Sequence, residues 1–224
     1  MDIVKELYSL QDLKYRDFHS KLIPNINKEL LIGVRVPLLR ALAKNIIKTN
    51  EQLCFLQQLP HKFYEENCLH AYIIGELNDF NQVVELTNKF LPYIDNWATC
   101  DTFSPKAFKH NSNKLLPHIR TWIESSHVYT TRFAVCCLMR YFLGDNYQQE
   151  YSDMVQNIKL NDYYIKMVVA WYFATALVKQ YNNVIHYLTE HKLDVWTHNQ
   201  TIKKANESFQ TPPAIKTYLK SLKR

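Results

Sequence analysis

Apolar residues recur along most of the chain at the three- and four-residue spacing of an α-helix. The clearest segments are VPLLRALAKNII (36–47), EENCLHAYIIGEL (65–77), QVVELTNKFLPYI (82–94), SNKLLPHIRTWI (112–123), TTRFAVCCLMRYFL (130–143), YYIKMVVAWYFATAL (163–177) and NNVIHYLTEH (182–191). None of them keeps the strict alternation of a half-buried strand. The pattern therefore predicts an all-α protein.

Residues typical of helix ends separate these segments. The breaks are Asn78-Asp79, Ser104-Pro105, Gly144-Asp145-Asn146 and Asn161-Asp162. Aspartate, asparagine and serine accept hydrogen bonds from the first free N–H groups of a helix, and proline suits its first position. We therefore expect Ser104 and Pro105 to be the N-cap and first residue of one helix, and Asp79 and Asp162 to precede two others.

The predicted helices have a period. Outer helices are expected to begin near positions 79, 112, 146 and 181, and more apolar inner helices near 62, 95, 129 and 162, a repeat of about 33–35 residues. This period is typical of an α-solenoid, whose helix pairs bury their apolar faces by stacking on their neighbours. Because the residue pattern of tetratricopeptide repeats is absent, we predict a single HEAT-like domain over residues 1–224 with a concave groove.

Residues at the same phase of such a repeat face a common surface. Arg132 follows Trp97 by 35 residues, and Lys166 follows Arg132 by 34. Trp171 lies five residues further along the helix of Lys166. We therefore expect these four side chains to lie on three successive inner helices.

Composition narrows the classes of function. The chain has only three glycines, which argues against a phosphate-cradling loop, and no apolar run reaches the roughly 18 residues of a membrane span. The start MDIVKELYSL is unlike a signal peptide, so we expect a cytoplasmic protein. We also expect a monomer. The five cysteines form no paired motif and are expected to be reduced core residues. A net charge of +6 is compatible with a polyanionic partner.

No cofactor or metal is expected. The nine histidines never form a metal-binding motif at helical spacing. No nucleophile motif marks a Ser–His or Cys–His site, although the sequence leaves that chemistry open. Basic charge of the kind found near the C-terminus usually belongs to a solvated helix face, and steering of a phosphate backbone is the alternative. The six residues concerned are Lys203, Lys204, Lys216, Lys220, Lys223 and Arg224.

Structural explanations exist for several of these residues. Tryptophan on an amphipathic helix is usually part of the core, which is our interpretation of Trp122 and Trp196. Asp101 can be the cap of a helix beginning near Thr102. Arg132 can pair with an acid on the surface, which contributes little to stability.

The chain resembles the AlkD-like DNA alkylation repair family, the HEAT-like repeat DNA glycosylases. The resemblance rests on GVRVPLLRALAK (33–44), DNWATCD (95–101), TTRFAVCCLMRYFL (130–143), YYIKMVVAWYFATALVK (163–179) and NQTIKKANES (199–208). Its most specific parts are the Trp-x-x-x-Asp segment, the Arg-Phe-Ala start of the next inner helix and the Ala-Trp of the one after.

The resemblance implies excision of cationic N3- or N7-alkylated purines from double-stranded DNA without base flipping. It further implies that Asp101 is the catalytic carboxylate, that Trp97 and Trp171 flank the deoxyribose of the lesion, and that Arg132 contacts a phosphate. We add Lys166 to the DNA-binding residues from its repeat phase. A fixed carboxylate suits the positive charge that develops on the sugar, and an indole face attracts a cation by ~0.5–2 kcal/mol.

The N-terminal segment departs from the family. Active relatives carry an additional helix before the position of Gly33, and it enters the DNA minor groove. Here Pro24 interrupts that interval, so a helix is expected to stop in its middle. The resemblance connects this kind of N-terminus with weak DNA binding and no demonstrated excision. The sequence thus leaves two hypotheses, an alkylpurine glycosylase and a catalytically weak or inactive scaffold for nucleic acid or protein.

Overall fold

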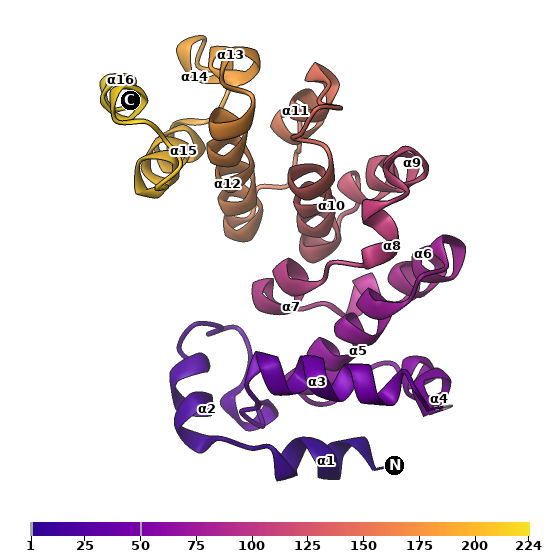
Figure 1. Cartoon of the computed structure of the whole chain (residues 1–224). Helices are drawn as coiled ribbons and strands as arrows, with labels where there is room; N and C mark the ends of the chain where they lie inside the picture. The colour runs from indigo at the N-terminus through magenta and orange to yellow at the C-terminus, as the bar shows by residue number, and fades with distance from the viewer. Residues whose placement is uncertain (1, 50) are drawn as a thin grey trace. The chain divides into compact units, whose positions relative to one another are not determined.

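The chain folds entirely into helices wherever its structure is described. The computed structural model describes residues 2–49 and 51–224, and every regular element in these ranges is a helix (Figure 1). The predicted all-α helical-repeat fold is confirmed. The helices form two compact units, residues 1–111 and 112–224. The expectation of one domain over the whole chain stays a prediction.

The first unit contains eight α-helices among its described residues. They are α1 (Ile3–Ser9), α2 (Leu13–His19), α3 (Val36–Ile46), α4 (Glu51–Gln57), α5 (Tyr64–Glu76), α6 (Phe80–Phe90), α7 (Trp97–Thr102) and α8 (Lys106–Lys109), with the 3-10 turns η1 (Lys28–Leu30) and η2 (Leu91–Tyr93). Helix α5 is the centre of this unit, because α3, α4, α6, α7 and α8 all pack against it.

The second unit is built from stacked helix pairs. It consists of α9 (Ser112–Ile123), α10 (Val128–Tyr141), α11 (Gln149–Gln156), α12 (Tyr163–Lys179), α13 (Tyr181–Val184), α14 (His186–Thr189), α15 (Val195–Glu207) and α16 (Pro213–Ser221). Helix α12 lies between α10 and α15, while α9 covers α10, and α11 and α13 cover α12. This is the layering of inner and outer helices that the repeat predicts.

Most predicted helix starts are close to the observed ones. The Asp79 carboxylate caps α6 by accepting from the Gln82 N–H at 2.7 Å, and Asp162 caps α12 in the same way. Helix α11, however, begins at Gln149 rather than near 146. The outer helix expected from 181 is split into the four-residue helices α13 and α14.

The inner helix expected near position 95 is much shorter than its repeat partners. Helix α7 ends at Thr102, because Pro105 disfavours helical backbone at the preceding residue and cannot donate to a carbonyl one turn earlier. Pro105 is itself the N-cap of α8, so the prediction that Ser104 is the cap and Pro105 the first helical residue is wrong by one position.

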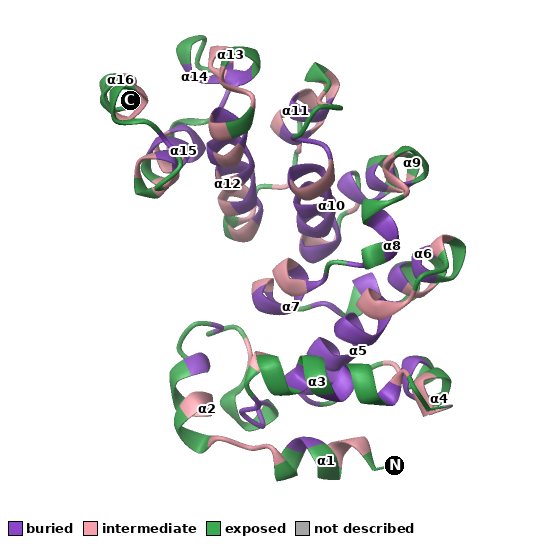
Figure 2. Cartoon of the chain, viewed as in Figure 1, coloured by how far each residue is buried: buried purple, intermediate pink, exposed green. Residues whose placement is uncertain are grey.

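The inner helices are buried almost all round, whereas the outer ones bury one face (Figure 2). Four of the five cysteines are buried and reduced, as expected, but Cys54 is exposed. Trp122 is a core residue as predicted, whereas Trp196 is only half-buried and lies against the exposed Tyr163, so its assignment to the core is wrong. Within residues 2–49 and 51–224, no helix combines the length and the apolar character that a bilayer span requires.

A buried carboxylate connects α5 to the segment before α3. Glu65 is 1% exposed, and its oxygens accept from the N–H groups of Ile32 at 2.8 Å, Gly33 at 2.7 Å and Val34 at 3.3 Å. Gly33 has φ of +96°, and a Cβ there would lie 2.6 Å from the Cβ of Arg16. The sharp approach to α3 therefore needs both the glycine and the carboxylate.

We predict that Glu65→Gln lowers the free energy of unfolding by about 2–3 kcal/mol. The carboxylate of Glu65 accepts from three backbone N–H groups with two oxygens, whereas the glutamine side chain would put an NH₂ donor in the place of one of them. Urea denaturation measures this change. The matched control is Glu85→Gln, which removes the exposed Glu85–Lys89 pair and is expected to cost below ~0.5 kcal/mol. Equal effects of the two substitutions would contradict the role assigned to Glu65.

Two histidines in the same unit lie between two phenylalanine rings. The Nε2 of His61 lies 2.8 Å from the Nδ1 of His70, and the two rings lie against Phe55 and Phe90 at centroid distances of 4.5 and 4.3 Å respectively. Burial lowers the pKa of His61 to about 4 and that of His70 to about 3. Both imidazoles are therefore neutral in the folded protein at neutral pH.

These lowered pKa values predict a loss of stability in mild acid. Well above pH 6.5 both histidines are neutral in the folded and unfolded states. As the pH falls through 6.5, the unfolded chain binds protons that the folded chain binds only near pH 4 and 3. Between pH 7 and 5 the free energy of unfolding should fall by about 2 kcal/mol per histidine. The double variant His61→Phe/His70→Phe should flatten this dependence in urea titrations, and an unchanged dependence would contradict the lowered pKa values.

Candidate functional site

Helix α7 carries two of the predicted site residues, and its start is fixed by Asn96. The side chain of Asn96 is fully buried, and its Oδ1 accepts from the Thr99 N–H at 2.8 Å. Its Nδ2 donates to Thr99 Oγ1 at 3.1 Å and to Asp95 Oδ1 at 2.9 Å. Trp97 is consequently the first residue of the helix.

Asp101 lies in the last turn of α7, so the interpretation of Asp101 as a helix cap is wrong. A carboxylate at the C-terminal end of a helix faces the negative end of the dipole and is disfavoured there. Neither N-capping nor the helix dipole of α7 favours an acid at this position. Trp97 and Asp101 are both half-buried and, at i and i+4, share one face of the helix.

The indole of Trp97 is anchored by the N-terminal segment. Its Nε1 donates to the Leu22 carbonyl at 3.0 Å. Next to Leu22, the predicted interruption at Pro24 is confirmed, because α2 ends at His19 and the chain remains non-helical until η1. The segment interrupted at Pro24 is therefore in direct contact with a predicted site residue.

Arg132, Lys166 and Trp171 belong to the second unit. Arg132 is 6% exposed, and one guanidinium nitrogen, Nη1, donates to the Tyr164 carbonyl at 2.6 Å, in the first turn of α12. The interpretation of Arg132 as a surface residue is therefore wrong. The Nζ of Lys166 lies 3.9 Å from Oδ1 of Asp194, which is the N-cap of α15. Trp171 is half-buried on α12.

The structure thus groups the predicted residues in two sets. Trp97 and Asp101 share α7, while Arg132 reaches from α10 to the first turn of the helix that carries Lys166 and Trp171. That the two sets line one groove stays a prediction. Asn96 was missed by the sequence reasoning, although asparagine ahead of a helix is an ordinary N-cap signal.

Nucleophilic and metal-dependent chemistry find little support near α7. The thiol of Cys68 lies 3.5 Å from Thr99 Oγ1, and burial raises its pKa to about 12, so it stays protonated at neutral pH. Among the described residues there is no cluster of three His, Cys, Asp or Glu side chains suited to a metal ion.

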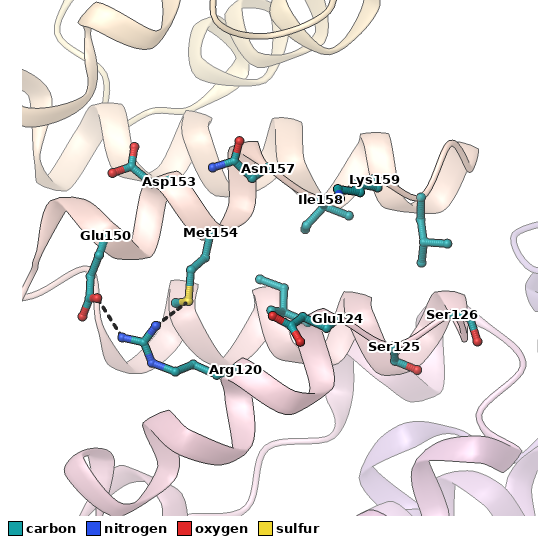
Figure 3. Close-up of a pocket in the computed structure, with 12 residues that line it drawn as sticks. Arg120, Glu124, Ser125, Ser126, Glu150, Asp153, Met154, Asn157, Ile158 and Lys159 are labelled. Carbon is teal, nitrogen blue, oxygen red and sulfur yellow. Dashed lines mark hydrogen bonds and ion pairs between the residues drawn. The ribbon is translucent and has the colours of Figure 1, made fainter.

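A cavity of about 850 Å³ opens elsewhere, in the second unit between α9 and the α11 segment (Figure 3). Its wall includes apolar residues such as Met154 and Ile158, and at one end Arg120 pairs with Glu150 at 2.7 Å. Its lining includes none of the five predicted site residues. The cavity therefore gives no information about the predicted site.

Comparison with known families assigns the chain. The family model described as DNA alkylation repair enzyme matches residues 3–209, nearly the whole chain, and the protein belongs to that family. Membership supports a role in DNA alkylation repair and implies interaction with DNA. A comparison with curated proteins found no match.

We predict that Asn96→Ala lowers the free energy of unfolding by about 1–2 kcal/mol through loss of the cap and also impairs DNA repair activity, because α7 carries Trp97 and Asp101. The matched control Asp79→Ala removes the cap of α6, which carries no predicted site residue. It should cost similar stability in urea denaturation and leave activity unchanged under folding conditions. Equal losses of activity in both variants would contradict the importance of α7.

Proposed function

We propose that the protein is a DNA glycosylase that hydrolyses the N-glycosidic bond of cationic N3- or N7-alkylated purines in duplex DNA without flipping the base. The observation that carries this proposal is the placement of Asp101 one helical turn after Trp97 on the same face of α7. Membership of the DNA alkylation repair enzyme family supports the choice of substrate.

Asp101 is proposed to stabilise the transition state. Alkylation leaves the purine positively charged, so the electron pair of the breaking C1′–N bond neutralises the departing base. Positive charge is left on the deoxyribose, and a fixed carboxylate near C1′ stabilises it. Water then adds to C1′ and loses a proton, which gives an abasic sugar and a neutral alkylpurine.

The tryptophans are proposed to recognise the charged nucleotide. An indole face attracts a cation by ~0.5–2 kcal/mol, depending on desolvation, so Trp97 and Trp171 favour an alkylated purine nucleotide over a neutral one. Contact through ring faces needs no pocket for an extruded base. The i and i+4 spacing on α7 allows Trp97 and Asp101 to address the same nucleotide.

Arg132 and Lys166 are proposed to hold the DNA backbone. The bond from Arg132 to the Tyr164 carbonyl fixes the cation at the start of α12. Lys166 lies near Asp194 but keeps a side chain that is 35% exposed. We propose that both contribute a salt-dependent contact with phosphate.

A second candidate function is a binding scaffold that has lost catalysis. The observation in its favour is the non-helical turn at Pro24, which stands where active relatives are expected to have a DNA-gripping helix. Such a scaffold would bind duplex DNA with an affinity that falls as salt rises, yet release no base.

We predict that Asp101→Asn lowers release of 3-methyladenine and 7-methylguanine from methylated duplex DNA by about 100-fold or more, with little change in DNA binding. Chromatography of the released bases measures the first effect, and fluorescence anisotropy the second. Asp145→Asn, in the break between α10 and α11, is the control and should retain full activity. Absence of release by the wild-type protein, together with salt-dependent binding, would replace the glycosylase proposal by the scaffold.

A further inference from the structure

Trp97 depends on another part of the chain for its orientation. It is the first residue of α7, so no preceding helical turn lies beneath its side chain. Trp97 is only partly buried, so packing in the core does not by itself fix the χ angles of the indole. Recognition of a charged nucleotide through the ring face requires one rotamer to be selected.

The contact that selects a rotamer comes from residues 20–27. The Leu22 carbonyl accepts the indole N–H of Trp97 at 3.0 Å. The backbone on both sides of this carbonyl is hydrogen-bonded. The Leu22 N–H donates to the His19 carbonyl at 2.9 Å, and the Ile26 N–H donates to the Ile23 carbonyl at 3.0 Å. Ile23 is fully buried and anchors the turn in the core.

A second contact ties the same turn to the residue before the cap of α7. The side-chain amide of Asn25 donates to the Asp95 carbonyl at 2.5 Å, across 70 residues of sequence. The carboxylate of Asp95 in turn accepts from the side-chain Nδ2 of Asn96 at 2.9 Å. The turn therefore makes two hydrogen bonds at the start of α7. One is to the backbone of Asp95, just before the N-cap, and the other is from the ring of Trp97.

We propose that residues 20–27 form a positioning element for Trp97, in which the Leu22 carbonyl orients the indole and Asn25 holds the turn against α7. This inference rests on the proposed function, in which the ring face of Trp97 contacts the lesion nucleotide. The proline-interrupted segment then has a part in the reaction site, because it orients a residue that touches the substrate.

The first test is structural and needs no activity. The protein has four tryptophans, and the indole N–H resonance of Trp97 in a nitrogen-15 NMR spectrum is identified by its loss in Trp97→Phe. We expect Asn25→Ala to speed hydrogen exchange of this N–H about three- to tenfold, the weight of one hydrogen bond. The control Asn45→Ala replaces another exposed asparagine, on α3, and should leave the exchange rate unchanged.

The second test is kinetic. Asn25→Ala and Trp97→Phe should each lower kcat for release of 3-methyladenine by about three- to tenfold, with a smaller change in KM, because each loosens the ring in the reacting complex. The double variant should be no slower than the slower single one, because both substitutions remove the same orientation. Asn45→Ala should match the wild type.

The outcomes separate the two proposals. Faster exchange with the kinetic pattern above supports the positioning role. Unchanged exchange in Asn25→Ala, or faster exchange with unchanged or additive kinetics, overturns it. If the wild type releases no base, the glycosylase proposal fails, and the positioning role is judged on anisotropy with methylated duplex DNA. Weaker binding by both Asn25→Ala and Trp97→Phe, but not by Asn45→Ala, supports it; unchanged binding overturns it.

Discussion

The structure depends on one constraint, that an inner helix of a helical repeat has neighbours on nearly every side. Polar groups on such a helix cannot turn to water and must find partners inside the protein, because an unsatisfied buried group costs ~1–3 kcal/mol. Glu65 of α5 meets this demand with three backbone N–H groups, and Arg132 of α10 meets part of it with the Tyr164 carbonyl. Both residues hold the start of a neighbouring helix or the segment before it, so satisfying the buried group also shapes the repeat.

Helix α7 is held in a different way, since six residues are too few to form a stable helix alone. Its start depends on the buried Asn96 cap, and its end is set by Pro105. Further support comes from the turn at residues 20–27, through Leu22 and Asn25. The helix that carries Trp97 and Asp101 is thus a product of tertiary contacts more than of its own sequence.

The parts of the fold that could be predicted are those governed by local periodicity and capping. Apolar spacing and the caps Asp79 and Asp162 placed the long helices of both units to within a few residues. Trp97 and Asp101 were correctly placed on one helix, but the cap was misassigned because Asn96, one residue before Trp97, was overlooked. The contact of Trp97 with Leu22 spans 75 residues of sequence, and no local pattern encodes a bond between an indole and a backbone carbonyl.

The same contact changes the meaning of the N-terminal departure that the resemblance implies. Considered along the sequence, Pro24 lies far from Asp101, and an altered N-terminus affects only the hold on DNA. In the folded unit, the residues beside Pro24 bind the indole of Trp97 and the backbone ahead of its helix. In the proposed glycosylase, DNA binding and catalysis are therefore coupled through α7. A change in the N-terminal segment would reach the proposed reaction site by moving the ring of Trp97, without altering Asp101 itself.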